Sequence, residues 1–181
     1  MPLIAAFDVG TTSLKAALIT RDGNLIHSQT KSVSTWSNEL GAIEQEPEQW
    51  YRLLAEAAHA WWRRGVDPAH IEMIATAGQM QNLITVDRHG IALGRAMLYA
   101  DVRASVQADA INDRFGRAEL RNTIGGAVTA ASLLPKLIFF WNMIPIDLSK
   151  RIEYYSAPRT ISYTAFAASP SVTGPPRQLL V

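Results

Sequence analysis

One short segment near the start of the chain combines residue types that can bind phosphate. It runs Asp8-Val9-Gly10-Thr11-Thr12-Ser13-Leu14-Lys15 and lies between two apolar runs that each predict a strand. A tight turn of glycine and hydroxyl residues can direct backbone N–H groups and hydroxyls at phosphate oxygens. Lys15 can add a compact positive charge, and Asp8 can hold a magnesium ion through water. A plain Gly/Thr hairpin with a strand-end aspartate is the structural alternative.

The phosphate-binding interpretation depends on the whole strand–turn–strand unit, because Gly-Thr-Thr alone is common in hairpins. The unit is not a Walker loop, since it lacks the Gly-Lys-Ser/Thr ending and the helix that follows. The predicted phosphate site comprises Asp8, Gly10, Thr11, Thr12, Ser13 and Lys15.

The surrounding pattern predicts the elements that hold this turn. Three short strands, at 3–7, 15–20 and 24–31, open the chain as an antiparallel meander, with a turn signal at 21–24. A helix then begins at Pro47, and its helically spaced apolar and aromatic residues predict core packing rather than a ligand site. Gly65 is placed to take a left-handed cap after it.

The remaining segments alternate between strands and helices. We expect strands at 71–77, 82–86 and 152–156, and helices at 101–115, 119–123 and 132–143. This order predicts an α/β domain with a mixed sheet.

Composition excludes several classes of protein. With 48% hydrophobic residues in 181, most of the chain is apolar enough to fold as one domain. A net charge of +1 argues against a dedicated nucleic-acid binder. The chain has no cysteine, which excludes disulfide scaffolds, Cys-ligated metals and thiol catalysis. The four histidines, His27, His59, His70 and His89, show no metal-ligand spacing.

We expect no membrane segment and a cytoplasmic location. The N-terminus reaches Asp8 without a basic region, unlike a signal peptide. The longest apolar run, 133–146, is interrupted by Pro135, Lys136 and Asn142 and is too short to span a bilayer.

Four further segments place polar residues at the ends of predicted elements. They are Glu44-Gln45-Glu46-Pro47 with Trp50, Gly78-Gln79-Met80-Gln81 with the turn Asp87-Arg88-His89-Gly90, Tyr99-Ala100-Asp101-Val102-Arg103, and Leu134-Pro135-Lys136-Leu137 with Trp141. Together with the Asp8 to Lys15 unit, in this order and at these spacings, they resemble the FGGY carbohydrate kinases over residues 3–166. The first unit alone resembles the phosphate loop of the wider sugar-kinase, Hsp70 and actin superfamily.

The resemblance implies a fold and a site. The fold would be a ribonuclease H-like domain of the actin-like ATPase type, with a mixed five-stranded sheet and helices on both faces. ATP and magnesium would be the cofactors, with Asp8 near the metal. The residues that would border the sugar are Gln79, Met80, Gln81, Tyr99 and Asp101.

Departures from the family's pattern bear on the substrate. Xylulose kinases usually have His where this chain has Gln81, and Tyr99 replaces the usual Trp. Gln81 can hydrogen-bond a polyol but cannot carry a proton charge. The chain lacks the Arg-Glu pair of glycerol kinases near Met80. We therefore expect a pentulose or similar sugar rather than glycerol.

Each predicted sugar residue has a structural alternative. Gln79 and Gln81 could be strand-end groups bonded to backbone, Met80 could be core, and Asp101 could cap the helix after it.

The family's catalytic aspartate would lie beyond this chain, as would the C-terminal kinase domain, so no catalytic residue is expected here. We expect residues 1–166 to form the family domain. The Pro- and Ser-containing segment 167–181 would be a tail unlike the family, disordered or produced by a frameshift.

Three functions follow. The first is phosphorylation of a sugar hydroxyl, with this chain inactive alone. The second is a non-catalytic sugar- or partner-binding module, or half of a split kinase. The third, an Hsp70- or actin-type ATPase, leaves Gly78 to Gln81 unexplained. We also expect self-association through surface that a missing domain would cover, including the apolar helix at 132–143.

Overall fold

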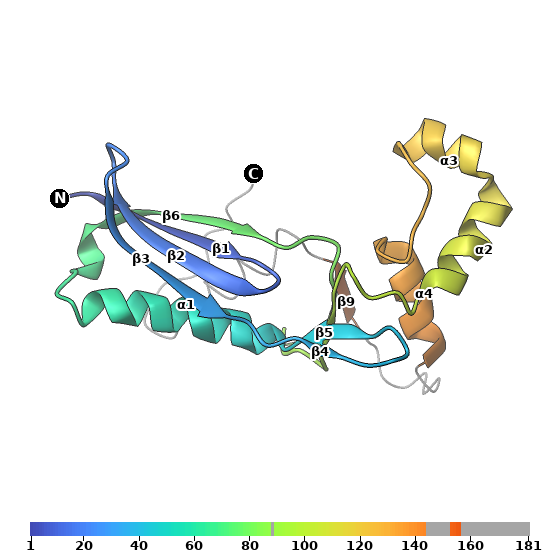
Figure 1. Cartoon of the computed structure of the whole chain (residues 1–181), viewed down its shortest axis with the longest axis horizontal. Coiled ribbons are helices and arrows are strands. Elements are labelled where there is room, and N and C mark those ends of the chain that lie inside the picture. Colours follow the sequence, from blue (N-terminus) through green and yellow to red (C-terminus); the bar gives the residue numbers. More distant parts are fainter. Residues whose placement is uncertain (88, 144–152, 157–181) are drawn as a thin grey trace.

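The computed structural model describes residues 1–87, 89–143 and 153–156. The predicted meander is confirmed, and it forms most of a four-stranded sheet in the order β3-β2-β1-β6 (Figure 1). Its strands are β1 (Leu3–Val9), β2 (Ser13–Thr20), β3 (Leu25–Ser32) and β6 (Ile71–Gly78). β1, β2 and β3 pair antiparallel and β6 pairs parallel to β1, so the sheet is mixed as expected.

Helix α1 (Pro47–Trp62) covers one face of this sheet (Figure 1). Its buried stripe of Trp50, Leu54, Ala57 and Trp61 packs in the core with the inward residues of β1 and β2. The ring of Trp61 lies 5.5 Å from that of Phe7, centroid to centroid. The helix therefore owes its place to hydrophobic burial, and Trp50 and Trp61 are core as predicted, whereas Trp62 is 39% exposed. Gly65 follows with a φ of 87°, the left-handed conformation expected after the helix.

A second sheet has the order β4-β5-β8-β7-β9 in the described part of the chain. Its strands are β4 (Trp36–Ser37), β5 (Ile43–Gln45), β7 (Leu83–Val86), β8 (Ala96–Met97) and β9 (Glu153–Ser156). The short 3-10 helix Pro68–His70 precedes β6. The helices α2 (Ser105–Phe115), α3 (Arg117–Ile124) and α4 (Leu133–Met143) lie at the second sheet's end of the molecule (Figure 1). A smaller cluster around Ala108, Ile111 and Val128 holds them together.

The strand register arranges the other face of the four-stranded sheet in three rows. Leu25, Ile19, Ile4 and Met73 form an apolar row, and Ser28, Ala17, Ala6 and Ala75 form a row of small residues. Thr30, Lys15, Asp8 and Ala77 form the third row, next to the turn between β1 and β2. Side chains of the last two rows line an open depression of about 440 Å³.

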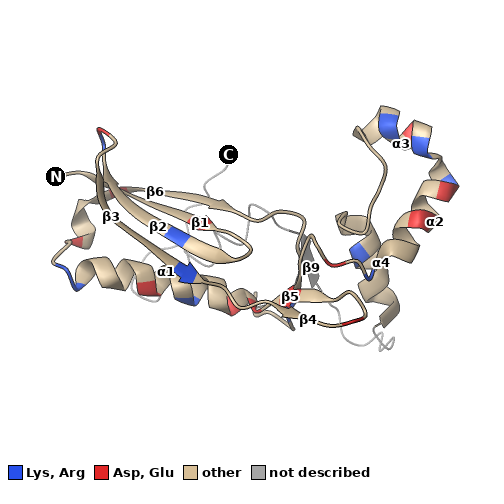
Figure 2. Ribbon diagram, in the orientation of Figure 1, with Lys and Arg blue, Asp and Glu red and all other residues tan. Residues whose placement is uncertain are grey.

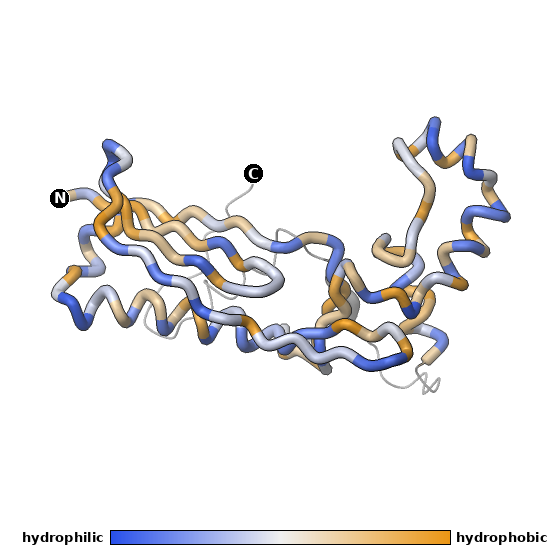
Figure 3. The backbone as a smooth tube through the Cα atoms, viewed as in Figure 1, coloured by the Kyte–Doolittle hydropathy of each residue, from blue (hydrophilic) through white to orange (hydrophobic). Residues whose placement is uncertain are grey.

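No described helix covers this face, which we call the open face. Met73 is 56% exposed on it. Lys15 and Asp8 are the charged residues of its three rows, and Figure 2 shows blue on β2 and red on β1, with further blue on β3. Apolar colour runs along β1 and β2 in Figure 3. Among the described strands, β6 has no neighbour on its outer edge.

The structure corrects two expectations. The expected five-stranded sheet with helices on both faces has four strands in the described part of the chain, with α1 on one face only. The helix expected at 101–115 begins at Ser105, because the side chain of Asp101 bonds to the chain around it instead of capping a helix. The expected tail at 167–181 lies outside the described residues, as does the end of the expected domain at 166.

Among the described residues, none of the helices has the length and the apolar content that a membrane-spanning helix requires.

Candidate functional site

The turn between β1 and β2 is a tight hairpin whose closure favours glycine at position 10. The Gly10 amide donates to the Ser13 carbonyl over 3.0 Å. A Cβ on Gly10 would lie 3.0 Å from that same oxygen, which is crowded for a backbone contact. The Gly10 amide is therefore occupied by the chain and is not available to a ligand.

The amides of Thr11 and Thr12, in the same turn, are not occupied in this way by any described residue. Within the described residues, no hydrogen bond occupies the N–H groups of Thr11 and Thr12. Their carbonyls are held instead: Thr12 accepts from the Val33 amide over 3.0 Å, and Thr11 accepts from the Gln45 side chain over 2.6 Å. Fixed carbonyls and open amides give a turn that can accept an anion.

Asp8 and Lys15 face each other across the β1–β2 ladder, on the open face. Both side chains are exposed, and neither forms an ion pair with any described residue. The pair therefore offers one carboxylate and one ammonium beside the turn. No group of three or more His, Asp or Glu side chains gathers as a metal site in the parts of the chain described.

The segment after β6 lies beside this turn because parallel strands end at the same edge of a sheet. The amide of Gln79 donates to the Val9 carbonyl over 3.0 Å, which continues the β1–β6 pairing. Met80 follows with 66% of its surface exposed, so the core alternative for Met80 is wrong. Gln81 is exposed too, and its φ of 60° is left-handed. Left-handed backbone is unfavourable for a residue with a Cβ, and such strain gathers at functional sites.

A buried glutamine connects the turn to this segment. Gln45 donates from Nε2 to the Thr11 carbonyl and to Thr35 Oγ1, over 2.6 and 2.8 Å. Its Oε1 accepts from Trp50 Nε1 and from Gln79 Nε2, over 2.8 and 2.9 Å. We call these five residues the Gln45 cluster. Since a side-chain amide has two donors and room for two acceptor bonds, Gln45 is fully satisfied and holds one orientation.

One hydrogen-bond acceptor of the Gln45 cluster has no partner among the described residues. The Oε1 atom of Gln79 is buried and has no hydrogen-bond partner among the described residues. Buried polar atoms are nearly always paired, so an unpaired one needs a water or a ligand. The backbone-bonding alternative for the Gln79 side chain does not hold, because its amide bonds to Gln45.

The segment after β8 approaches from another side. Tyr99 is 47% exposed, and its amide donates to Oδ1 of the buried Asn82 over 3.0 Å. Asn82 directly follows Gln81 in the sequence, so this hydrogen bond connects the segment of Tyr99 to the segment of Gln81.

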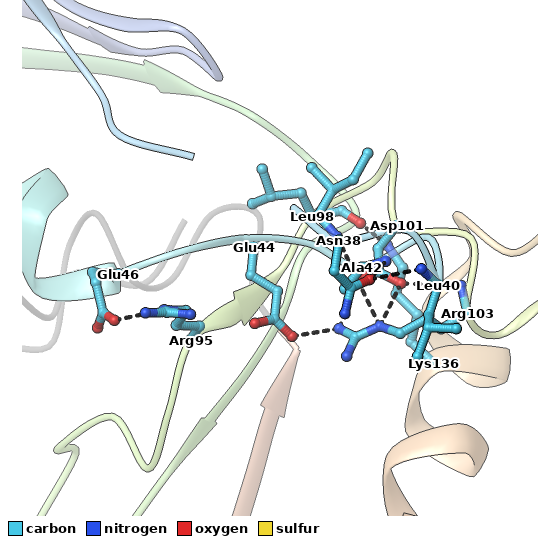
Figure 4. Close-up of polar contacts among 11 residues, drawn as sticks. Asn38, Leu40, Ala42, Glu44, Glu46, Arg95, Leu98, Asp101, Arg103 and Lys136 are labelled. Atoms are coloured by element: carbon cyan, nitrogen blue, oxygen red, sulfur yellow. Dashed lines mark hydrogen bonds and ion pairs between the residues drawn. The ribbon is translucent and has the colours of Figure 1, made fainter. Parts of the chain in front are cut away.

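Asp101 is fully buried, and its carboxylate organises its surroundings. It accepts from the amide of Ile43 over 3.0 Å and from the guanidinium of Arg103 over 2.7 Å, which also pairs with Glu44 (Figure 4). Burial lowers the pKa of Arg103, but the hydrogen bonds and charges of Asp101 and Glu44 outweigh it and raise the pKa overall. The capping alternative is wrong, because the residue before α2 is Ala104. A sugar-contacting role for Asp101 stays a prediction, and its burial favours an indirect one.

Sequence reasoning assigned no role to Gln45, Asn82 or Lys136. Gln45 and Lys136 lie in the segments that carry the family resemblance. Their importance follows from their burial, which the sequence alone does not show. Asn82 lies at the start of a predicted strand, where polar residues are common and do not by themselves indicate a functional role.

Comparison with known proteins identifies the family. The profile of the FGGY family of carbohydrate kinases, N-terminal domain, matches residues 3–159. The chain belongs to this family. Xylulose kinase from Staphylococcus epidermidis is 26% identical over 158 residues, covering 87% of this chain and 31% of that protein. Xylulose kinase from Lactococcus lactis is 29% identical over 160 residues, covering 88% and 32%.

The fold of this FGGY domain also matches solved structures. The crystal structure of xylulose kinase from Rhodospirillum rubrum superposes with a TM-score of 0.75 at 18% identity, covering 88% of this chain and 33% of that one. The actin-like ATPase type of fold is therefore confirmed. The chain spans about a third of the length of the curated relatives it matches.

Proposed function

We propose that this chain forms the phosphate- and sugar-binding part of an ATP-dependent sugar kinase, acting on a pentulose or a similar sugar. The observation that carries the proposal is the Gln45 cluster. One buried side chain bonds both to the Thr11 carbonyl of the turn and to Gln79 of the Gly-Gln-Met-Gln segment. A kinase must align a phosphate donor with a hydroxyl acceptor, and most of its rate comes from that positioning.

The residues at the turn fit the phosphates of a magnesium nucleotide. The open amides of Thr11 and Thr12 would take phosphate oxygens, and Lys15 would add charge neutralisation. Asp8 would hold the magnesium ion through water. The bound nucleotide supplies the phosphoryl group that is transferred.

The sugar would lie against Gln81, Met80 and Tyr99, the exposed members of the predicted set. The unpaired Oε1 of Gln79 can accept from a hydroxyl. Asp101 would act through the backbone that it holds. Cytoplasmic location is part of the same proposal, since neither the cofactor nor a chain without cysteine needs an oxidising compartment.

We do not expect this chain alone to transfer the phosphoryl group, because no described residue is assigned as the base that takes the hydroxyl proton. Isothermal titration of the 181-residue chain with D-xylulose tests it. We expect millimolar or tighter binding that Gln81→Ala weakens and the surface variant Val106→Ala does not, without ATP turnover. Absence of sugar binding in the folded chain would overturn the sugar assignment, and rapid turnover would overturn the inactivity.

A split kinase is the second candidate, favoured by the open face and by the unpaired outer edge of β6 among the described strands. Both are surfaces that a further polypeptide can cover. Mixing the chain with the separately expressed C-terminal part of the Staphylococcus epidermidis xylulose kinase tests this candidate. Restored sugar-dependent ATP turnover supports it, and unchanged inactivity with no complex on size exclusion counts against it.

A further inference from the structure

Lys136, on helix α4, is a fully buried lysine. Its side chain is 0% exposed although it comes from α4, a helix rich in apolar residues. The ammonium donates to two backbone carbonyls, that of Gln81 over 2.8 Å and that of Leu98 over 2.7 Å. Lysine is almost never fully buried without partners, so these two bonds account for its position.

The two carbonyls belong to the two segments of the proposed sugar site. Gln81 has the left-handed φ of 60°, a conformation that its surroundings must hold in place. Leu98 precedes Tyr99, whose amide is bound by Asn82. Lys136 therefore fixes one peptide plane in each segment, and Asn82 provides a second link between them.

The charges around Lys136 support a charged ammonium. Asp101 attracts it. Arg103 pairs with Asp101 and with Glu44 (Figure 4), and its guanidinium lies 5.5 Å from the ring centroid of Phe139, which is also on α4. The elements packed against α4 add little: β7 carries no charged residue, and Asp109, Asp113 and Arg114 of α2 are exposed. Burial lowers the pKa of Lys136 to about 8, against the opposite effect of Asp101. The charge can therefore be removed under conditions that a protein tolerates.

We propose that Lys136 is a positioning residue of the sugar site, which holds the Gln81 and Leu98 carbonyls so that Gln81 and Tyr99 present their side chains to the sugar. This inference rests on the proposed function for its sugar part. The hydrogen bonds can be tested without a sugar.

The first experiment follows the backbone amides of Asn82 and Tyr99 by NMR in the full chain. Each amide shares its peptide plane with a carbonyl that Lys136 binds, so its chemical shift reports that hydrogen bond. From pH 6.5 to 9.5 we expect both amides to titrate together with a midpoint of about 8. The titration disappears in Lys136→Met and persists in Leu134→Met, a matched change at an exposed position of the same helix. Independent or flat titration in the wild type overturns the inference, whether or not Lys136→Met folds.

The second experiment measures D-xylulose affinity by isothermal titration at pH 7 and pH 9. Loss of a charged hydrogen-bond donor should weaken binding by about tenfold in Lys136→Met at pH 7. Affinity should fall toward pH 9 in the wild type and in Leu134→Met and stay flat in Lys136→Met. Equal affinity of wild type and Lys136→Met overturns the positioning role and leaves the proposed function standing. Absence of binding by a wild type whose amides titrate as expected overturns the proposed sugar site instead.

Discussion

The side-chain amide of Gln45 lies 2.6 Å from the carbonyl oxygen of Thr11 and holds the turn between β1 and β2 from behind. The same glutamine accepts from Gln79, which follows β6. Because its four hydrogen bonds leave no freedom to rotate, the turn and the Gly-Gln-Met-Gln segment are held in one geometry.

Replacing Gln45 should destabilise the chain and weaken ligand binding together. Gln45→Leu leaves the Thr11 carbonyl, the Trp50 N–H and the Gln79 amide without partners in a buried place, at a cost of about 3 kcal/mol in the free energy of unfolding. Urea unfolding measures it. Gln49→Leu is the matched control, because Gln49 bonds to Ser34 at the surface, and we expect a loss below about 1 kcal/mol. Equal losses for the two variants would contradict the special position of Gln45.

A methyl group on Gly10 should disturb the turn. Its Cβ would crowd the Ser13 carbonyl, which the Gly10 amide already holds close. We expect Gly10→Ala to lower the free energy of unfolding by about 1 kcal/mol and to weaken binding of magnesium ATP. Gly94→Ala serves as the control, because a Cβ there meets no atom within 4 Å. A Gly10→Ala chain with unchanged stability and nucleotide affinity would show that the turn can relax without consequence.

Stability should rise with pH through the titration of Lys136. Its pKa is about 8 in the folded chain and 10.5 as its ordinary value. Between these values the unfolded chain binds more protons than the folded chain, so the free energy of unfolding increases as pH rises. The difference between wild type and Lys136→Met isolates this contribution from other groups that titrate there. Parallel profiles of unfolding free energy against pH for wild type and Lys136→Met from pH 7 to 10 would rule out this contribution of Lys136.

The open face should cause self-association. Met73 and Ile4 lie side by side in its apolar row, and apolar faces of this kind associate when uncovered. Met73→Lys should reduce the sedimentation coefficient of the chain at high concentration toward that of a monomer. Val106→Lys, on an exposed residue of α2 away from the sheet, should not. A wild-type chain that sediments as a monomer at all concentrations would exclude the association.

The elements with strong periodicity could be predicted from the sequence. Strands β1 and β2 of the meander alternate between buried and more exposed residues, and α1 repeats its apolar stripe over four turns, so both patterns are long enough to detect. The strands β4, β5 and β8 contain two or three residues each and show no period. They exist because they pair with each other, which is information about the fold and not about a local segment.

The site could be predicted only in part for a related reason. Glycine and hydroxyl residues identify the turn, and the resemblance indicates the sugar segment. The Gln45 cluster joins residues 34 positions apart through polar groups that a sequence pattern would place at the surface. Lys136 interrupts an apolar helix, which in the sequence argues only against a membrane span. Its two carbonyl partners can be identified only from the fold, in which α4 lies against β7.

The most direct test of the account is an NMR titration of the 15N-labelled chain with a magnesium complex of a non-hydrolysable ATP analogue and, separately, with D-xylulose. The account predicts that the nucleotide shifts the amides of Thr11 and Thr12 and that the sugar shifts those of Gln79, Met80 and Gln81. Shifts confined to other parts of the chain, or none at either segment with the fold intact, would contradict it.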